Sequence, residues 1–347
     1  MRWRVVAGIV LAAAGLGVVS PAWACGCGGY MPELGAGTAS ERARVYGERA
    51  LVQHANGQET ITLAMTVRGS SKKAAWIMPV PSQARVQLGD RDLFGQLAMA
   101  TRPRKVYRTT YWPFRGFLKE IGGRRDGAGA PAAGGGVDVR QQMRLGPFEV
   151  ARLGATDPTA VTRWLATNGY VVPDGLAANL APYVMEKWEI IAVRLAPEDK
   201  KGELSGETPP LRLSFASDRI VYPMRLSKGA TTPQTVTVYV ATGHRVEPTV
   251  LPDPSVQPEL VFAGRADVAA LSSIYLTAYS VKYDQPGRIT NDFTFAQAPT
   301  DDEFRQVVTI ERNNPVPVTL AILAVPPLAG LIAILIGVRR RRTARLP

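Results

Sequence analysis

The sequence predicts an α+β fold: antiparallel or mixed sheets, a few short helices and one C-terminal transmembrane helix. Segments of alternating or continuous apolar residues recur between turn signals, as in the strands of a sheet. A few short segments instead have apolar residues at helical spacing behind a capping residue. An uncharged stretch near the end of the chain is followed at once by a run of arginines.

The N-terminus has the organisation of a secretory signal peptide. Arg2 and Arg4 precede the apolar run 5–19, and Ala22-Trp23-Ala24 follows it. A charged start, a short apolar core and an Ala-x-Ala site predict that residues 1–24 are a signal peptide cleaved after Ala24. An alternative is a lipoprotein signal, in which Cys25 is the lipidated residue.

Cys25 and Cys27 are the only cysteines of the chain and are its disulfide or redox candidates. An oxidising compartment permits a disulfide, and a Cys-x-Cys bridge would be strained and easily reduced. Lipidation of Cys25, a metal site and free thiols remain alternatives. Two thiolates are two ligands short of a tetrahedral zinc site. We therefore predict no metal and no cofactor.

The first strands are predicted on both sides of an Asn-Gly turn. Residues 49–54 and 59–68 flank Asn56-Gly57, which is the strongest short-range signal of a hairpin. Residues 74–81 are apolar almost throughout and end in two prolines. They predict a buried strand that the prolines terminate.

Three aspartates mark predicted helix starts. Asp90, Asp157 and Asp174 each precede apolar residues at helical spacing, and aspartate is a favoured N-cap. The last two of these helices lie between predicted strands at 148–153 and 188–195. We expect these helices to pack on one face of a sheet.

The second half of the chain predicts further strands. Residues 211–216, 220–226 and 236–246 are interpreted as three strands in antiparallel succession. Residues 274–283 and 304–310 are predicted to be further strands, close to the membrane.

Residues 105–119 combine aromatic and basic side chains. Such mixtures suit sugar rings, lipid headgroups or extended peptides. The alternative is a strand and loop that cover the core. The Gly- and Ala-rich stretch 122–136 predicts a flexible loop. The ligand-binding candidates are Tyr107, Arg108, Tyr111, Trp112 and Arg115.

The C-terminal apolar stretch predicts a single membrane span. Residues 316–338 carry no charge, and a helix of that length crosses a bilayer. The arginines that follow favour the cytoplasmic side. We therefore predict a single-pass protein of the cell membrane. Its α+β body, residues 25–315, lies outside the cell and forms one domain or two lobes. Residues 339–347 form a basic cytoplasmic tail.

The net charge of +12 is concentrated at the ends of the chain. Arg2 and Arg4 belong to the predicted signal peptide and five arginines to the tail, which leaves +5 on the body. That modest balance argues against nucleic acid as a partner. The predicted partners are membrane lipid, through the C-terminal helix, and an envelope polymer or another membrane protein.

Six short motifs follow one another along the chain. They are Cys25-Gly-Cys27, Trp76-Ile-Met-Pro-Val-Pro81, Gly146-Pro-Phe-Glu-Val150, Trp164-Leu-Ala-Thr-Asn-Gly-Tyr170, Val221-Tyr-Pro-Met-Arg-Leu-Ser227 and Gly243-His-Arg-Val246. This ordered series, from Cys25 to at least Val246, resembles the bacterial family called domain of unknown function 2330. That resemblance implies a secreted or membrane-anchored bacterial protein and carries over no catalytic residues.

The sequence contains neither a His-Glu-x-x-His zinc motif nor a Gly-x-Ser-x-Gly nucleophile elbow. Its catalytic residues, if any, are unknown, and we expect a binding protein rather than an enzyme. The leading hypothesis is a membrane-anchored extracytoplasmic binding or interaction module of the cell envelope. Two alternatives are a thiol-dependent redox protein that uses Cys25 and Cys27, and a hydrolase with an unrecognised site.

Overall fold

The structure is a computed structural model that describes residues 28–35, 44–68, 72–111, 139–145, 148–153, 157–195, 206–230, 232–271, 274–314 and 316–343. The predicted signal peptide, the predicted loop at 122–136 and the end of the tail lie outside these ranges. The chain divides into two compact units. The body comprises Met1–Thr101 and Gly127–Phe304, and the second unit comprises Arg102–Asp126 and Arg305–Pro347.

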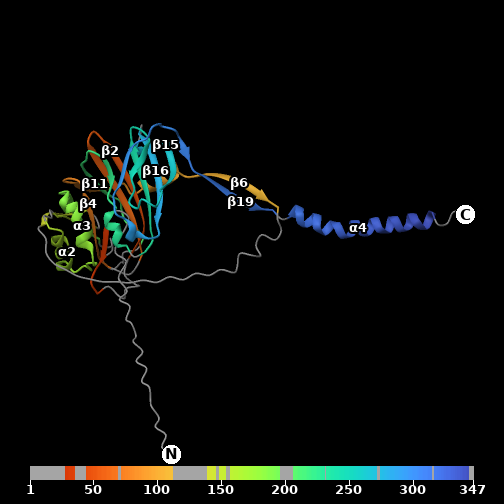
Figure 1. Ribbon diagram of the computed structural model, residues 1–347, viewed down its shortest axis with the longest axis horizontal. Helices are drawn as coiled ribbons and strands as arrows, with labels where there is room; N and C mark the ends of the chain where they lie inside the picture. The colour runs from red at the N-terminus through yellow and green to blue at the C-terminus, as the bar shows by residue number, and fades with distance from the viewer. Residues whose placement is uncertain are drawn as a thin grey trace, which may run out of the picture. The chain divides into compact units, whose positions relative to one another are not determined.

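The first sheet of the body has five strands, and each pairs with its neighbours in antiparallel fashion (Figure 1). Its second strand β4 is buried along its whole length, because both faces of this sheet are covered. In sheet order, the strands are β1 (Gly29–Pro32), β4 (Ala74–Val80), β9 (Glu189–Leu195), β8 (Phe148–Leu153) and β7 (Val139–Leu145).

In the largest sheet β13 pairs with β2 in parallel, whereas β3 pairs antiparallel with β2 and β11, β5 with β11, and β16 with β13 and β15. The short strand β10 (Gly206–Glu207) also pairs with β3. In sheet order, its strands include β15 (Glu259–Arg265), β16 (Tyr275–Tyr283), β13 (Gln234–Thr242), β2 (Arg44–Ala55), β3 (Gln58–Arg68), β11 (Leu211–Ala216) and β5 (Arg85–Leu88).

A small third sheet and several short helices complete the body. The third sheet has the order β12 (Ile220–Tyr222), β17 (Phe293–Gln297) and β14 (Val246–Val250). The helices are α1 (Leu93–Ala100), α2 (Pro158–Thr167), α3 (Leu176–Met185), and the 3-10 turns η1 (Arg225–Gly229), η2 (Ala269–Leu271) and η3 (Pro286–Arg288).

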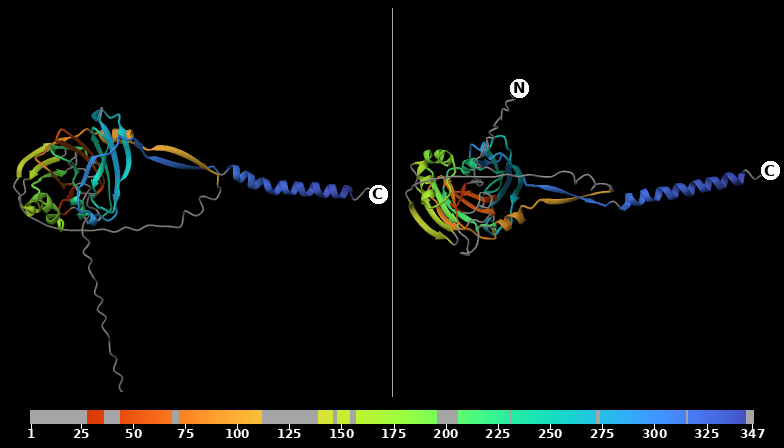
Figure 2. Two further views of the ribbon diagram at one scale, coloured as in Figure 1. Left: turned by 45° about the horizontal axis from the view of Figure 1, so that its top comes forward. Right: turned by 90° about the horizontal axis from the view of Figure 1, so that it is seen from below.

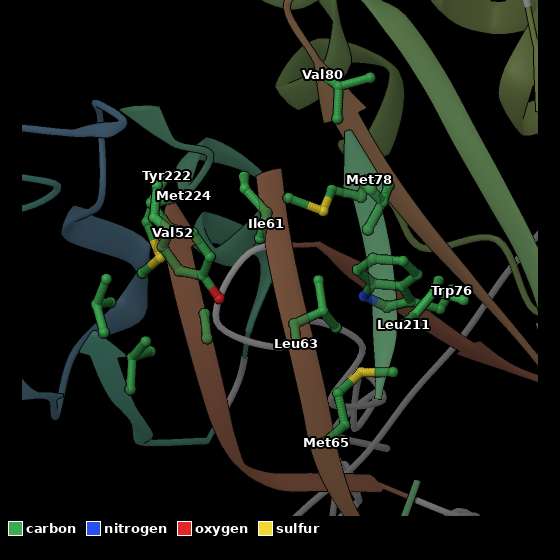
Figure 3. Close-up of a cluster of buried hydrophobic side chains, with 14 of the residues drawn as sticks. Val52, Ile61, Leu63, Met65, Trp76, Met78, Val80, Leu211, Tyr222 and Met224 are labelled. Carbon is green, nitrogen blue, oxygen red and sulfur yellow. The ribbon is translucent and has the colours of Figure 1, made fainter. Parts of the chain in front are cut away.

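The main hydrophobic core lies between the five-stranded sheet and the largest sheet (Figure 3). Trp76 and Met78 of β4 reach into it from one side, and Ile61 and Leu63 of β3 from the other. Side chains alternate along a strand, so every second residue of these strands faces this core. The two sheets therefore form a sandwich held together by apolar burial.

Helices cover the outer faces of the sandwich. On the five-stranded sheet, Ile77 of β4 packs in a second core with Trp164 of α2 and Leu180 of α3. On the largest sheet, α1 packs in a third core through Phe94, which lies with Leu51 of β2. This layering of mixed sheets and short helices confirms the predicted α+β fold.

Local signals correctly positioned two elements. Asn56 and Gly57 have φ of 53° and 71° and close the β2–β3 hairpin, as predicted. Asp157 is the N-cap of α2 and accepts a hydrogen bond from the Thr159 amide at 2.9 Å. The other two predicted caps are wrong: α1 begins after Asp92 and α3 after Gly175, neither with a side-chain capping bond.

The buried strand predicted at 74–81 is confirmed: β4 is buried along its length and ends at Val80, just before the second proline. Two other strand predictions require correction. The segment 220–226 leaves the strand conformation after Tyr222. The predicted antiparallel succession is wrong, because β11, β12 and β13 pair with strands distant in sequence.

The second unit consists of a two-stranded ribbon and a long helix (Figure 2). Strand β6 (Arg104–Thr110) pairs in parallel with β19 (Val307–Asn313). The short strand β18 (Phe304–Arg305) precedes β19 in the chain. The helix α4 (Val316–Thr343) continues without interruption through its internal prolines. Its segment Val318–Arg340 is long enough and apolar enough to cross a membrane, by length and composition.

Candidate functional site

The ribbon contains the ligand-binding candidates that the structure describes. Tyr107 and Tyr111 are 52% and 50% exposed, and Arg108 is also exposed. The alternative, a strand and loop that cover the core, stays a prediction, because this segment belongs to the second unit. Trp112 and Arg115 lie outside the described residues. Tyr107 and Arg108 thus lie on β6, and Tyr111 directly follows it.

The two faces of the ribbon mix basic and apolar side chains. Residues 102–111 and 305–314 include six basic side chains and one acidic, a net charge of +5. On one face the guanidinium of Arg312 lies over the ring of Tyr107, 4.0 Å from its centroid. Val308 on β19 is 42% exposed. This composition is typical of surfaces that meet anionic, partly apolar partners.

The remaining sequence candidates, Cys25 and Cys27, lie outside the described residues. Gly28, the next residue, approaches β4 so closely that a Cβ there would lie 2.3 Å from the carbonyl oxygen of Ile77. The described ranges contain no group of three or more His, Cys, Asp or Glu side chains able to hold a metal. The redox alternative therefore stays a prediction.

A second candidate site is an open groove of about 950 Å³ over β5 and β11. Ser214 pairs across the ladder with Arg85, and Arg212 with Gln87, so these side chains share one face of the sheet. The opposite face points into the main core through Leu213 and Val86. The groove is therefore built on rigid strands. Its lining includes Gln58, Gln83, Arg85, Gln87, Arg212 and Ser214.

The electrostatics of this groove differ from those of the rest of the body. No acidic residue is among its lining residues. Among the described arginine side chains of the body, only Arg85 and Arg212 have no hydrogen bond, ion pair or ring contact. Sequence reasoning missed this site because its residues come from three separated stretches. Only the unusual Arg-Val-Gln alternation at Arg85 offered a local signal.

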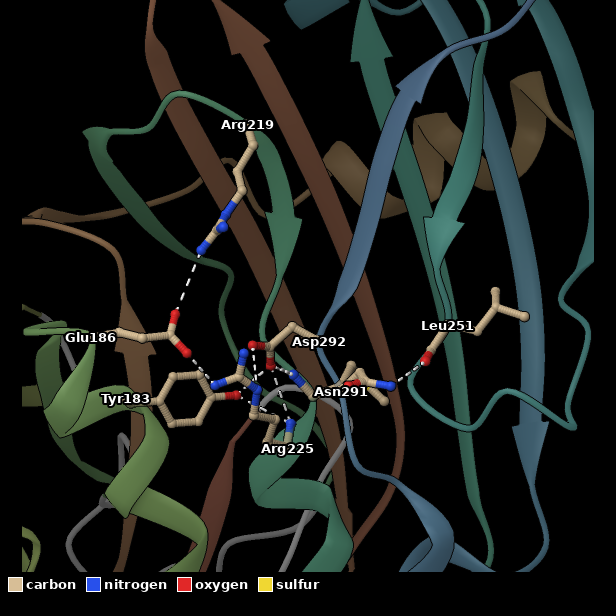
Figure 4. Close-up of polar contacts among 8 residues, drawn as sticks. Tyr183, Glu186, Arg219, Arg225, Leu251, Asn291 and Asp292 are labelled. Atoms are coloured by element: carbon tan, nitrogen blue, oxygen red, sulfur yellow. Dashed lines mark hydrogen bonds and ion pairs between the residues drawn. The ribbon is translucent and has the colours of Figure 1, made fainter.

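A third cluster is buried and joins α3, η1 and the residue before β17 (Figure 4). Asp292 is 4% exposed and accepts hydrogen bonds from the Tyr183 hydroxyl and from the Met224 amide at 2.8 Å. Its other oxygen lies 3.0 Å from Nε of Arg225. Arg225 also donates to Glu186 at 2.5 Å.

Burial raises the pKa of Asp292, and the guanidinium of Arg225 with the hydrogen bonds to the carboxylate opposes that rise. Burial likewise raises the pKa of Tyr183 well above its ordinary range. None of the residues of this network lines the described groove. We therefore interpret the cluster as a connection between elements rather than a site for ligand.

Glu59 is a second buried carboxyl group, fully inaccessible on β3. One of its oxygens accepts a hydrogen bond from the Val221 amide at 2.9 Å, and the other has no hydrogen-bond partner among the described residues. Burial raises the pKa of Glu59 well above its ordinary value. The folded protein therefore holds this proton more tightly than the unfolded chain does.

The free energy of unfolding is consequently expected to fall as pH rises, because the buried Glu59 carboxyl group then loses its proton. The contribution is complete below the unfolded pKa of about 4.3 and is lost as pH rises through the higher folded pKa. The Glu59→Gln variant lacks this proton and should lose less stability as pH rises above the unfolded pKa of glutamate, about 4.3. Chemical denaturation of the detergent-solubilised full chain at several pH values measures this. If the free energy of unfolding depended on pH equally in the variant and the wild type, the prediction would be contradicted. Asp292, another buried carboxyl group with a raised pKa, is present in both proteins and contributes equally to both curves.

The described part of the chain is a β-rich α+β protein in which α4 is able, by length and composition, to cross a membrane. The chain belongs to the bacterial family described as uncharacterized protein conserved in bacteria (DUF2330), which matches residues 21–296. The match confirms the resemblance predicted from the motifs and extends beyond them. Neither a curated protein nor a solved structure matches the chain.

Proposed function

We propose that this protein is a single-pass, outward-facing binding module of the bacterial cell envelope. In this proposal residues 1–24 direct export, α4 anchors the chain, and the tail from Arg339 remains in the cytoplasm. The observation that carries it is the second unit, in which a basic, aromatic ribbon ends three residues before α4 begins.

The chemistry of the ribbon supports a position at the membrane surface. Three residues span at most about 10 Å, so the end of β19 stays near the headgroups if α4 crosses the bilayer. Tyrosines favour the membrane interface, and each cation near an anionic surface contributes about 1 kcal/mol of attraction. The body is then tied to the membrane through two paired strands rather than through a single linker.

Protease treatment of intact spheroplasts tests this arrangement. A full chain with an epitope after Pro347 should lose its body, while the epitope survives on a small membrane-protected fragment. Permeabilised cells, in which both are digested, provide the control. Loss of the epitope with an intact body would reverse the orientation, and release of the chain by alkaline washing would remove the anchor. Either result would refute the proposal.

A further inference from the structure

We infer that the β5–β11 groove binds an anionic glycan polymer, a chain of sugar or polyol units that carries carboxylate or phosphate groups. This inference deepens the proposed function and rests on it, because the outer side of the membrane is where such polymers are found. It assigns a ligand class to residues that come together only in the fold, chiefly Arg85 and Arg212.

The first argument is that the two guanidinium groups have no carboxylate partner among the described residues. Nearly every other described arginine side chain of the body is neutralised by a carboxylate, such as Arg194 by Glu149 at 2.7 Å. Arg85 and Arg212 have no such partner in the described chain, and their groove has no acidic lining residue. A guanidinium fork forms its strongest contacts with carboxylate or phosphate. The missing counter-charge is therefore expected to come from a ligand.

The second argument is their spacing. Because Arg85 pairs with Ser214, Arg212 is its diagonal neighbour on the adjacent strand. Diagonal neighbours on one face lie about 7–8 Å apart. Both stand on strands whose other face packs in the main core, so the backbone is already ordered and only the two side chains must be ordered on binding. A polymer with an anion on successive units contacts both at once.

The third argument is the set of neutral groups around them. Gln58, Gln83 and Gln87 line the same groove. An amide side chain both donates and accepts hydrogen bonds, as sugar and polyol hydroxyls do. An acidic peptide added to the free edge of β5 would lie in the plane of the sheet. The arginines stand on the face of the sheet instead, which favours a chain that crosses that face.

Binding of defined polymers to the full chain tests the inference. The protein is placed in nanodiscs of zwitterionic lipid and titrated with fluorescent polygalacturonate, poly(glycerol phosphate), dextran or polyglutamate. We expect binding to polygalacturonate, poly(glycerol phosphate) or both, weakened by salt, and none to dextran. The first two arms separate a carboxylate polymer from a phosphate polymer. Comparable binding to dextran, or tightest binding to polyglutamate, would overturn the assignment.

Variants connect the binding to the groove. Arg85→Gln and Arg212→Gln should each weaken binding about 10-fold, and the double variant about 100-fold. Arg212→Lys keeps the charge but loses the fork, so its loss should be smaller. Arg163→Gln, an equal charge change on α2, should stay within about twofold. An unchanged affinity in the double variant would locate binding elsewhere, for example on the ribbon, and refute the inference.

Failure of this inference can be told apart from failure of the proposed function. The spheroplast experiment reports orientation and needs no polymer, whereas the nanodisc titration needs no particular orientation. The exposed Arg85 and Arg212 side chains make no described contacts, so the double variant should melt at the wild-type temperature. If the double variant melts at a lower temperature, the Arg212→Lys variant is used instead. Weaker polymer binding by Arg212→Lys at an unchanged melting temperature would assign the loss to the guanidinium contact rather than to the fold.

Discussion

Replacing Trp76 by alanine is expected to lower the free energy of unfolding by about 4 kcal/mol. Trp76 is completely buried on β4 and lies in the core between the two large sheets (Figure 3). Its removal takes away the largest fully buried side chain of the described chain and leaves a cavity at the sandwich interface. Guanidinium denaturation of the detergent-solubilised full chain, followed by circular dichroism, measures the effect.

The Trp76→Phe variant separates packing from hydrogen bonding. Nε1 of Trp76 has no hydrogen-bond partner among the described residues, so the smaller aromatic ring loses volume but no polar contact. We expect a loss of less than about 2 kcal/mol. Met185→Ala, at a position 75% exposed on α3, should change stability by less than about 0.5 kcal/mol. Equal effects of the alanine variants at Trp76 and Met185 would contradict the assigned core.

Replacing Asp292 by alanine is expected to cost about 3 kcal/mol, near the lower end of the range for breaking a buried ion pair. The variant leaves the Tyr183 hydroxyl and the Met224 amide without their acceptor, and Arg225 without its buried partner. The side chain of Arg225 is still 23% exposed, and water there reduces the loss. For a body of this size, the thermal midpoint should fall by roughly 6–12 °C.

Two further variants make this prediction specific. Asp292→Asn retains an oxygen that accepts from Tyr183 and Met224, so it should lose less than the alanine variant. Asp284→Ala removes the partner of Lys282 in an exposed ion pair and should leave the thermal midpoint nearly unchanged. A midpoint for Asp292→Ala within about 1 °C of wild type would show that the buried network does not connect α3, η1 and β17 energetically.

Elements defined by near neighbours were predictable from the sequence. The Asn56-Gly57 hairpin and the Asp157 cap of α2 depend on residues two or three positions away. The apolar segment within α4 depends only on composition along one helix. The wrong caps at Asp90 and Asp174 have a similar local origin. In each case, a nearby residue, Asp92 or Gly175, begins the helix instead.

Strand pairing was not predictable in the same way. Residues 211–250 contain strands adjacent in sequence, and each nevertheless joins a distant partner; β13 even pairs in parallel with β2. Local periodicity states which face of a strand is apolar but not which strand lies beside it. That choice follows from the burial of two sheet faces at once, which involves the whole body.

The candidate sites also differ in whether they depend on neighbouring or on distant residues of the chain. The sequence by itself determined the aromatic and basic composition of the ribbon strand β6, the apolar segment of α4 and the family, because these are properties of continuous stretches. Only the tertiary structure decided that β6 is exposed beside β19, that Asp292 meets Tyr183, and that Arg85 and Arg212 share a groove without counter-charges. The physical reason is that burial and charge pairing depend on residues far apart in the chain.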